Sequence, residues 1–136
     1  MSRKEYIETN LHANCFACGS NNGGGLRLRF QEKEDGSVVA YFTADPKFEG
    51  YSGMVHGGII STLLDSAMTH CLLKKGIFAL TGRLSIRYFF SIRVGTVVKL
   101  EARVMRRLHK VFFLQAKAFV EEKKAACAEA SYMLRR

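Results

Sequence analysis

The sequence predicts an α+β domain in which one long central helix is wrapped by a curved antiparallel sheet of about five to six strands. Residues 57–75 have helical periodicity, whereas the other apolar segments alternate in the manner of strands. The last four strand-like segments follow one another through short turns, which join antiparallel neighbours. We therefore expect residues 1–136 to form a single domain, with residues 1–24 as an N-terminal segment and not a separate unit.

The expected strands alternate with turn signals along the chain. Residues 26–30 alternate strictly and predict a first strand, and Asp35-Gly36 predicts a hairpin turn into a second strand at 37–43. Four further strands are expected after the helix, at 81–90, 96–105, 111–120 and 126–134. In the last two, alanines recur on one face, and their small side chains would let the sheet approach the helix closely.

The helix has clear start and stop signals. His56-Gly57-Gly58 precedes the periodic region, Lys74-Lys75 lies in the predicted last turn, and Gly76 follows as a stop. The face opposite the apolar one is polar but carries small side chains, and Asp65 is its only formal charge at neutral pH. A freely solvated face usually carries several charges, so we expect this face to be packed and Asp65 to lie in a groove.

The two glycines leave the start of the helix without side chains. The first N–H groups of a helix have no intrahelical partner and lie at the positive end of its dipole. A substrate carbonyl could approach the Gly57 N–H closely, so this turn predicts an oxyanion hole. The alternative is an ordinary turn before a core helix, since glycine is common at helix ends.

Several segments resemble the hotdog-fold acyl-CoA thioesterases, in particular the phenylacetate-pathway (PaaI-like) type related to 4-hydroxybenzoyl-CoA thioesterases. The segments that carry this resemblance are residues 15–19 with 25–26, 48–58, 63–65 and 81–88. The resemblance extends from about residue 14 to residue 134, and it is more specific for the superfamily than for the substrate. It implies the hotdog fold, in agreement with the strand and helix pattern.

The resemblance also implies hydrolysis of an acyl-CoA thioester to a carboxylic acid and coenzyme A. Asp65 would act as general base or nucleophile, and Thr81 would orient the water and the carboxylate. His56 would hold the loop or contact the substrate carbonyl region. Alternatively, Thr81 is only a strand-starting residue and His56 a capping residue. Many relatives carry Asn where this chain has Gly50, so one carbonyl-polarising side chain would be absent.

The spacing of Gly57 and Asp65 predicts a dimer. Eight residues of helix correspond to about 12 Å, so one thioester cannot react with both groups of the same chain. If both groups act on one substrate, Asp65 must come from a second copy. We therefore expect a homodimer with two composite sites, possibly assembled further into a dimer of dimers.

The net charge of +9 favours an anionic partner such as the coenzyme A phosphates. No motif of a nucleic-acid-binding module is found, so nucleic acid is not expected. A non-catalytic acyl-CoA-binding protein, acting as a sensor or carrier, is the alternative function. The residues expected to contact substrate are Gly50, Gly58, Ser66, Met68, Arg83, Phe89 and Arg93.

The four cysteines do not form a standard metal-binding pattern. Cys15 and Cys18 form a Cys-x-x-Cys pair, but neither Cys71 nor Cys127 completes a second pair. We expect reduced thiols, no metal, and no cofactor apart from coenzyme A as part of the substrate. With no membrane-length apolar run and no signal-peptide core at the N-terminus, the sequence predicts a cytoplasmic protein without a membrane partner.

Overall fold

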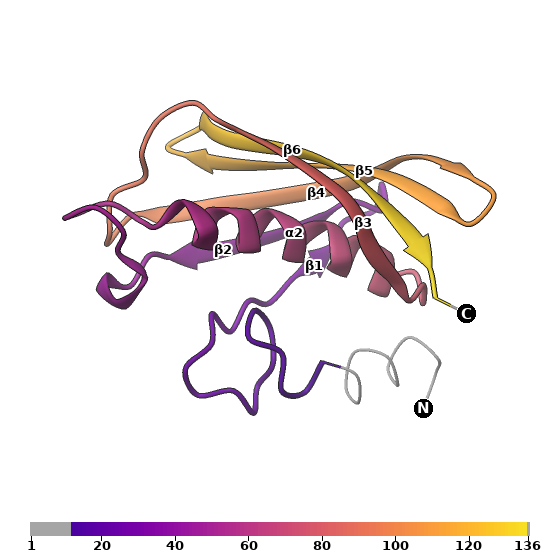
Figure 1. Cartoon of the computed structure of the whole chain (residues 1–136), viewed down its shortest axis with the longest axis horizontal. Helices are drawn as coiled ribbons and strands as arrows, with labels where there is room; N and C mark the ends of the chain where they lie inside the picture. Colours follow the sequence, from indigo (N-terminus) through magenta and orange to yellow (C-terminus); the bar gives the residue numbers. More distant parts are fainter. Residues whose placement is uncertain (1–11, 136) are drawn as a thin grey trace.

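The computed structural model describes residues 12–135, and it contains one long helix held against a curved six-stranded antiparallel sheet (Figure 1). The elements in chain order are β1 (Gln31–Glu32), β2 (Val38–Thr43), the 3₁₀ helix η2 (Pro46–Phe48), α2 (Gly57–Leu73), β3 (Ala79–Tyr88), β4 (Val97–Leu108), β5 (Val111–Val120) and β6 (Lys123–Leu134). The fold class and the number of strands agree with the sequence prediction.

The sheet has the strand order β1-β2-β4-β5-β6-β3, so β1 and β3 form its two edges. The hairpin expected at Asp35-Gly36 is present, since Gln31 pairs with Val39 and Gly36 has a φ of +86°. On the other edge, β3 pairs with no strand but β6 among residues 12–135, and it is exposed over most of its length. Its outer edge therefore has unpaired backbone donors and acceptors.

Helix α2 lies across the concave side of the sheet and packs against β2 to β6 (Figure 1). Its sheet-facing residues are fully buried, among them Leu63, Leu64 and Ala67. Opposite them lies the expected row of small side chains on β5 and β6. The buried alanines of this row are Ala116, Ala118, Ala126, Ala128 and Ala130. These small residues let a single helix sit close to the centre of the sheet.

The helix ends at Leu73, two residues before the end expected from Lys75. The last turn tightens, because the Lys75 N–H donates to the Leu72 carbonyl and the Gly76 N–H to the Leu73 carbonyl. Gly76 then reverses the chain with a φ of +73°, a conformation that glycine adopts without steric cost. The expected stop signal is therefore correct, and the last lysines belong to the turn.

The expected strand at residues 26–30 is wrong, because only Gln31–Glu32 pairs as a strand in this region. The Leu26 and Leu28 N–H groups instead donate to the carbonyls of Phe16 and Ala17 in the N-terminal segment. Between them, Arg27 has a φ of +55°, which interrupts an extended strand. The alternation reflects burial against the core, since Leu26 and Leu28 are both buried.

The N-terminal segment lies on the side of α2 that faces away from β4, β5 and β6 (Figure 1). Phe30 stacks on His70 near the end of α2, with ring centroids 4.7 Å apart. The helix is therefore covered by the sheet on one side and partly by this segment on the other. Within residues 12–135, no helix is both long enough and apolar enough to cross a membrane.

Candidate functional site

Asp65 lies half-buried on α2 and receives two side-chain hydrogen bonds on the same oxygen. The Thr81 hydroxyl donates to Oδ1 over 2.8 Å, and the Tyr132 hydroxyl donates to Oδ1 over 2.6 Å. No described residue bonds to Oδ2. Two donors therefore hold one carboxylate oxygen of Asp65, and the other oxygen remains available to accept a proton.

Tyr132 was missed by the sequence reasoning. It is fully buried and occupies the next inward-facing position of β6 after Ala126, Ala128 and Ala130. Burial and the negative charge of Asp65 raise the pKa of Tyr132 well above its usual value, so it remains a donor. One signal in the sequence could have identified Tyr132. It is a tyrosine that continues a row of inward-facing alanines, so its hydroxyl was bound to need a partner inside the protein.

His56 caps the start of α2. Its Nδ1 accepts a hydrogen bond of 2.8 Å from the Gly58 N–H, which is the capping role given above as the alternative for His56. The Gly57 N–H has no acceptor among the described residues. Of the two glycine N–H groups, therefore, only that of Gly57 is available to polarise a carbonyl.

An open groove of about 870 Å³ lies beside the start of the helix. Its lining is mainly apolar and aromatic and includes the expected residues His56, Gly57, Gly50 and Phe89. A Cβ atom added at Gly50 would lie 3.0 Å from the Cα of His56. In this chain the space of a residue-50 side chain is thus taken up by the backbone of the capping residue.

The other expected substrate contacts are scattered. Met68 is fully buried in the core, and Ser66 is 7% exposed, so neither offers a side chain to a ligand on the surface of one chain. Arg83 pairs with Ser131 on the side of the sheet away from α2. Arg93 is exposed and bridges to Met54 in the loop that leads to the groove.

The groove lies at the start of α2, whereas the Asp65 carboxylate lies at the middle of the helix. Thr81, near the start of β3, contacts Asp65, whereas Tyr88, at its end, donates to the Gly57 carbonyl over 3.1 Å and bonds to the Ser61 hydroxyl. Strand β3 therefore runs antiparallel to the helix, and Asp65 does not line the groove at Gly57. One chain alone does not bring its own Gly57 and Asp65 together.

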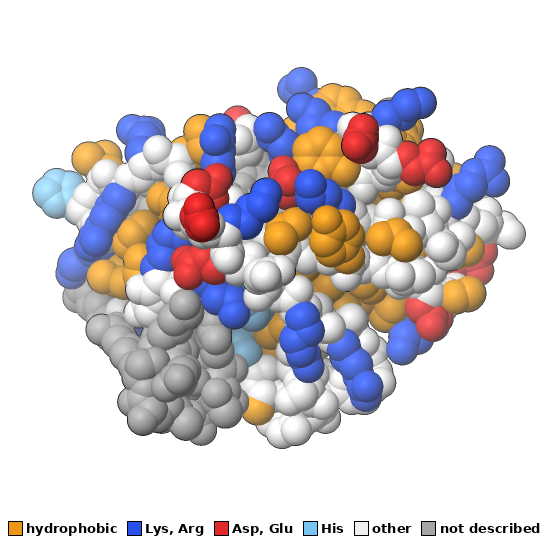
Figure 2. Space-filling view, turned by 180° about the vertical axis from the view of Figure 1, so that it is seen from behind, with side chains coloured by type: hydrophobic (Ala, Val, Ile, Leu, Met, Phe, Trp, Pro, Cys, Tyr) orange, Lys and Arg blue, Asp and Glu red, His pale blue; other side chains and the backbone are white. Residues whose placement is uncertain are grey.

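Basic side chains are spread over the molecule. Figure 2 shows Lys and Arg side chains scattered over the visible part of one face, interspersed with fewer acidic and several apolar side chains. No single basic stripe is visible on that face. This distribution is compatible with the expected attraction of anionic small molecules.

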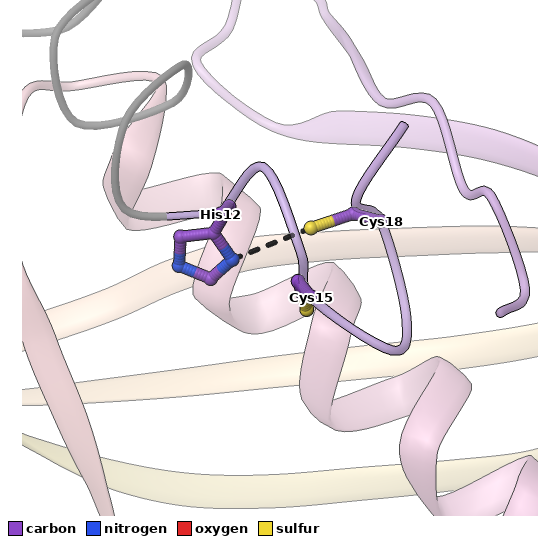
Figure 3. A group of neighbouring side chains, drawn as sticks. All are labelled: His12, Cys15 and Cys18. Atoms are coloured by element: carbon purple, nitrogen blue, oxygen red, sulfur yellow. Dashed lines mark hydrogen bonds between the residues drawn. The ribbon is translucent and has the colours of Figure 1, made fainter. Parts of the chain in front are cut away.

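A second cluster of polar side chains could hold a metal ion. His12, Cys15 and Cys18 each bring one ligand atom to within 4.8 Å of the other two (Figure 3). His12 was overlooked by the sequence reasoning, although it precedes Cys15 by only three residues. Nearby, burial and then the positive charges of His12, Lys74 and Arg29 lower the pKa of His70 to about 3.

The profile of the thioesterase superfamily matches residues 52–127, more than half of the chain, including the helix start, Asp65 and β3. The chain belongs to the thioesterase superfamily. The hotdog domain expected from the sequence is therefore the domain of this superfamily.

Among curated thioesterase relatives, the acyl-coenzyme A thioesterase THEM4 of Bos taurus is 24% identical over 120 residues. That match covers 88% of this chain and 49% of the bovine protein, so the chain spans about half the length of this relative.

Several solved structures share the fold. Protein RHA08564, a thioesterase superfamily protein, superposes with a TM-score of 0.81 at 21% identity, over 86% of this chain and 61% of that one. The smu.793 protein of Streptococcus mutans, solved bound to acetyl CoA, has a TM-score of 0.74 at 22% identity, over 79% and 88%. The E. coli PaaI protein of the phenylacetic acid degradation operon has a TM-score of 0.74 at 16% identity, over 79% and 83%.

Proposed function

We propose that this chain hydrolyses acyl-CoA thioesters to a carboxylic acid and coenzyme A. The observation that carries the proposal is the Asp65 carboxylate, whose Oδ1 is held by Thr81 and Tyr132 while Oδ2 has no bond from a described residue. A protein that only binds acyl-CoA has no need for a carboxylate that is held through one oxygen, with the other oxygen open, on an otherwise uncharged helix face. The name of the bovine relative supports the same substrate class.

The chemistry requires one base and one oxyanion donor. Asp65 takes a proton from a water molecule as that water attacks the thioester carbonyl, or it attacks the carbonyl itself to give a mixed anhydride that water then opens. The Gly57 N–H stabilises the negative charge that forms on the carbonyl oxygen. When the intermediate collapses, the C–S bond breaks and the coenzyme A thiolate leaves and takes up a proton.

The two groups act together across a dimer. The Gly57 N–H of one subunit would face the partner subunit's Asp65, because the separation along one helix, about 12 Å, exceeds reacting distance. The exposed edge of β3 supports this arrangement, since an unpaired strand edge is suited to pairing with a second copy. Two-fold pairing of this edge gives two identical composite sites.

The contacts of β3 also define the register of that pairing. Thr81 contacts Asp65 and Tyr88 contacts Gly57, so in this dimer Thr81 of one subunit would lie opposite Tyr88 of the other. Between them the strand has a one-residue register shift at Gly82, and counting across it makes Ser85 the midpoint. Ser85 would therefore face its own copy on the two-fold axis.

A cysteine at position 85 tests this register. Directly opposed residues of an antiparallel pair have Cα atoms about 4.5–5.5 Å apart, within the range that a disulfide bridges. Ser85→Cys should therefore form a covalent dimer under mild oxidation, seen on a non-reducing gel. Arg103→Cys on β4, which is also exposed, is the control and should remain monomeric on the same gel.

The apolar groove beside Gly57 is the proposed acyl site. Its lining of Phe89, Phe90 and Ile60 suits an aromatic or aliphatic chain, and Gly57 lies at its edge. Many relatives carry Asn at the position of Gly50, and glycine has no side-chain amide to donate there. In this chain, polarisation of the thioester carbonyl would therefore depend chiefly on the Gly57 N–H.

The test is a panel of acyl-CoA substrates followed by thiol release, with wild type and Asp65→Asn side by side. The substitution keeps the shape of the side chain and removes its basicity, so kcat on the best substrate should fall by roughly 10²-fold or more with the fold retained. Saturable binding of acyl-CoA without turnover by wild type would instead identify a sensor or carrier. Equal rates for both proteins would refute the assignment of Asp65.

A further inference from the structure

The side chains of His12, Cys15 and Cys18 lie close together in the N-terminal segment. The Nδ1 atom of His12 lies 3.3 Å from the Sγ atom of Cys18, and the Cys15 Sγ lies within 4.8 Å of both atoms (Figure 3). All four cysteines of the chain lie in the described part, and none is in a disulfide. Two thiols and one imidazole therefore share a small volume.

These separations are close to those of a tetrahedral zinc site. With Zn–S near 2.3 Å and Zn–N near 2.0–2.1 Å, tetrahedral angles separate N from S by about 3.5 Å and S from S by about 3.8 Å. The His12–Cys18 separation already matches the first value closely. Small side-chain rotations suffice to bring Cys15 into the same geometry.

The backbone of this segment forms the turn that such a site requires. The Gly19 N–H donates to the Cys15 carbonyl over 2.8 Å, and the Cys15 N–H donates to the His12 carbonyl over 3.0 Å. A Cβ at Gly19 would lie 2.3 Å from the Cys15 nitrogen, so only glycine fits there. The tight turn aligns the two cysteines on one side of the loop.

A candidate fourth ligand lies on helix α2, beside the three-residue cluster. His70 is 8% exposed, and its Nε2 atom has no hydrogen-bond partner in the described part of the chain. It borders the same cavity as His12 and Cys18, and its ring centroid lies 5.8 Å from that of His12. A buried imidazole nitrogen without a hydrogen-bond partner destabilises the folded protein unless a ligand such as a metal ion binds to it.

We propose that His12, Cys15, Cys18 and His70 bind one zinc ion. Thiolate and imidazole ligands favour zinc over magnesium or calcium, which prefer oxygen. Binding converts both thiols to thiolates and releases two protons to the solvent, and the two negative charges neutralise the ion. The nearby positive charges of Arg29 and Lys74 therefore do not oppose it.

The ion has a structural role in this proposal. Four protein ligands leave no open position for a substrate or water, which is the pattern of a structural site. The ion would connect the turn at residues 12–18 to α2 five residues after Asp65. This replaces the sequence-based expectation of no metal, which depended on the lack of a second ligand pair at the usual spacing.

The test begins with the wild-type chain purified under reducing conditions without chelator. Metal analysis should find about one zinc per chain, and replacement by Co²⁺ should give the absorption of a tetrahedral ion with two thiolate ligands. A thiol reagent should react with two more cysteines after the zinc is removed than before. Zinc removal should also lower the Tm while the curved sheet is retained.

Variants then identify the ligands. Cys15→Ser and Cys18→Ser should each abolish stoichiometric zinc, and His70→Gln should weaken binding at least 10-fold. Cys127→Ser, on β6 and outside the cluster, is the matched control and should retain the zinc. The proposal fails if reduced wild type neither contains nor takes up zinc, or if both cysteine variants bind it like wild type. Because the wild-type measurements need no variant, they decide the matter even if a cysteine variant misfolds.

Discussion

The Tyr132 hydroxyl lies 2.6 Å from Oδ1 of Asp65 and 3.0 Å from the carbonyl oxygen of the same residue. A buried side chain of β6 thus fixes both the carboxylate and the backbone of the helix residue that carries it. The orientation of the Asp65 carboxylate, the proposed catalytic group, is consequently fixed by Tyr132 of β6 and by Thr81 of β3.

Removing this hydroxyl should affect rate and stability together. Tyr132→Phe keeps the buried ring but leaves Oδ1 with one donor fewer, so we expect kcat to fall about 10-fold and the free energy of unfolding by about 1–3 kcal/mol, typical of a bond to a charged group. Steady-state kinetics and denaturant unfolding measure the two effects. Tyr41→Phe, at an exposed position of β2, is the control and should change neither. Unchanged kinetics in Tyr132→Phe would mean that the bond only stabilises the fold.

The two glycines at the helix start should respond differently to alanine. A Cβ at Gly57 meets nothing closer than the Tyr88 hydroxyl at 3.9 Å, so Gly57→Ala should fold normally but lose activity as its methyl group keeps the substrate carbonyl from the N–H. A Cβ at Gly58 lies 3.0 Å from the His56 Nδ1, so Gly58→Ala should displace the cap and destabilise the helix by about 1 kcal/mol. Thermal unfolding and kcat distinguish the two. Full activity in Gly57→Ala would remove Gly57 from the oxyanion hole.

Mixed dimers test the composite site. Asp65→Asn and Gly57→Val should each be inactive alone, because each defect affects both sites of its homodimer. After the two are unfolded and refolded together, about half of the dimers are hybrids with one intact site, so about one quarter of wild-type activity should return. Mixing the folded homodimers without subunit exchange is the control. Refolded mixtures that stay inactive would show that each chain uses its own Asp65.

The positive charge predicts how salt affects substrate binding. Attractions between exposed charges are screened, with a Debye length of about 10 Å at 0.1 M salt, whereas burial of the acyl group is not. Raising the salt concentration should therefore raise KM for acyl-CoA and leave kcat nearly unchanged. An acyl-pantetheine thioester, which lacks the nucleotide phosphates, should respond less. Equal responses of both substrates would assign the basic surface to another anionic partner, and nucleic acid would then be tested directly.

Local patterns were sufficient to predict most of the fold. Periodicity and caps predicted α2 nearly to its ends, and strict alternation predicted β2 and β3–β6 within a few residues. The same alternation failed at residues 26–30, because burial against the core produces it without strand pairing. Whether an extended segment joins a sheet depends on distant hydrogen-bond partners, here Phe16 and Ala17, which no local pattern reveals.

The part of the candidate site that lies on α2 could be predicted from the sequence. His56, Gly57 and Asp65 share the helix and its start, so their relation follows from helix geometry. Tyr132 was missed because it reaches Asp65 only through folding, whereas His12 was overlooked although it lies only three residues before Cys15. Tyr132 follows Asp65 by 67 residues, and the two meet only because α2 packs against β6.

The placement of Gly57 and Asp65 on one rigid helix has a consequence for communication between subunits. In the proposed dimer, the first turn of each α2 serves one site and its third turn serves the other. A small shift of the helix, induced when an acyl group fills the first groove, moves the carboxylate of the second site by the same amount. The two sites are then mechanically coupled, and binding of an acyl group in one groove changes the position of the carboxylate that serves the other.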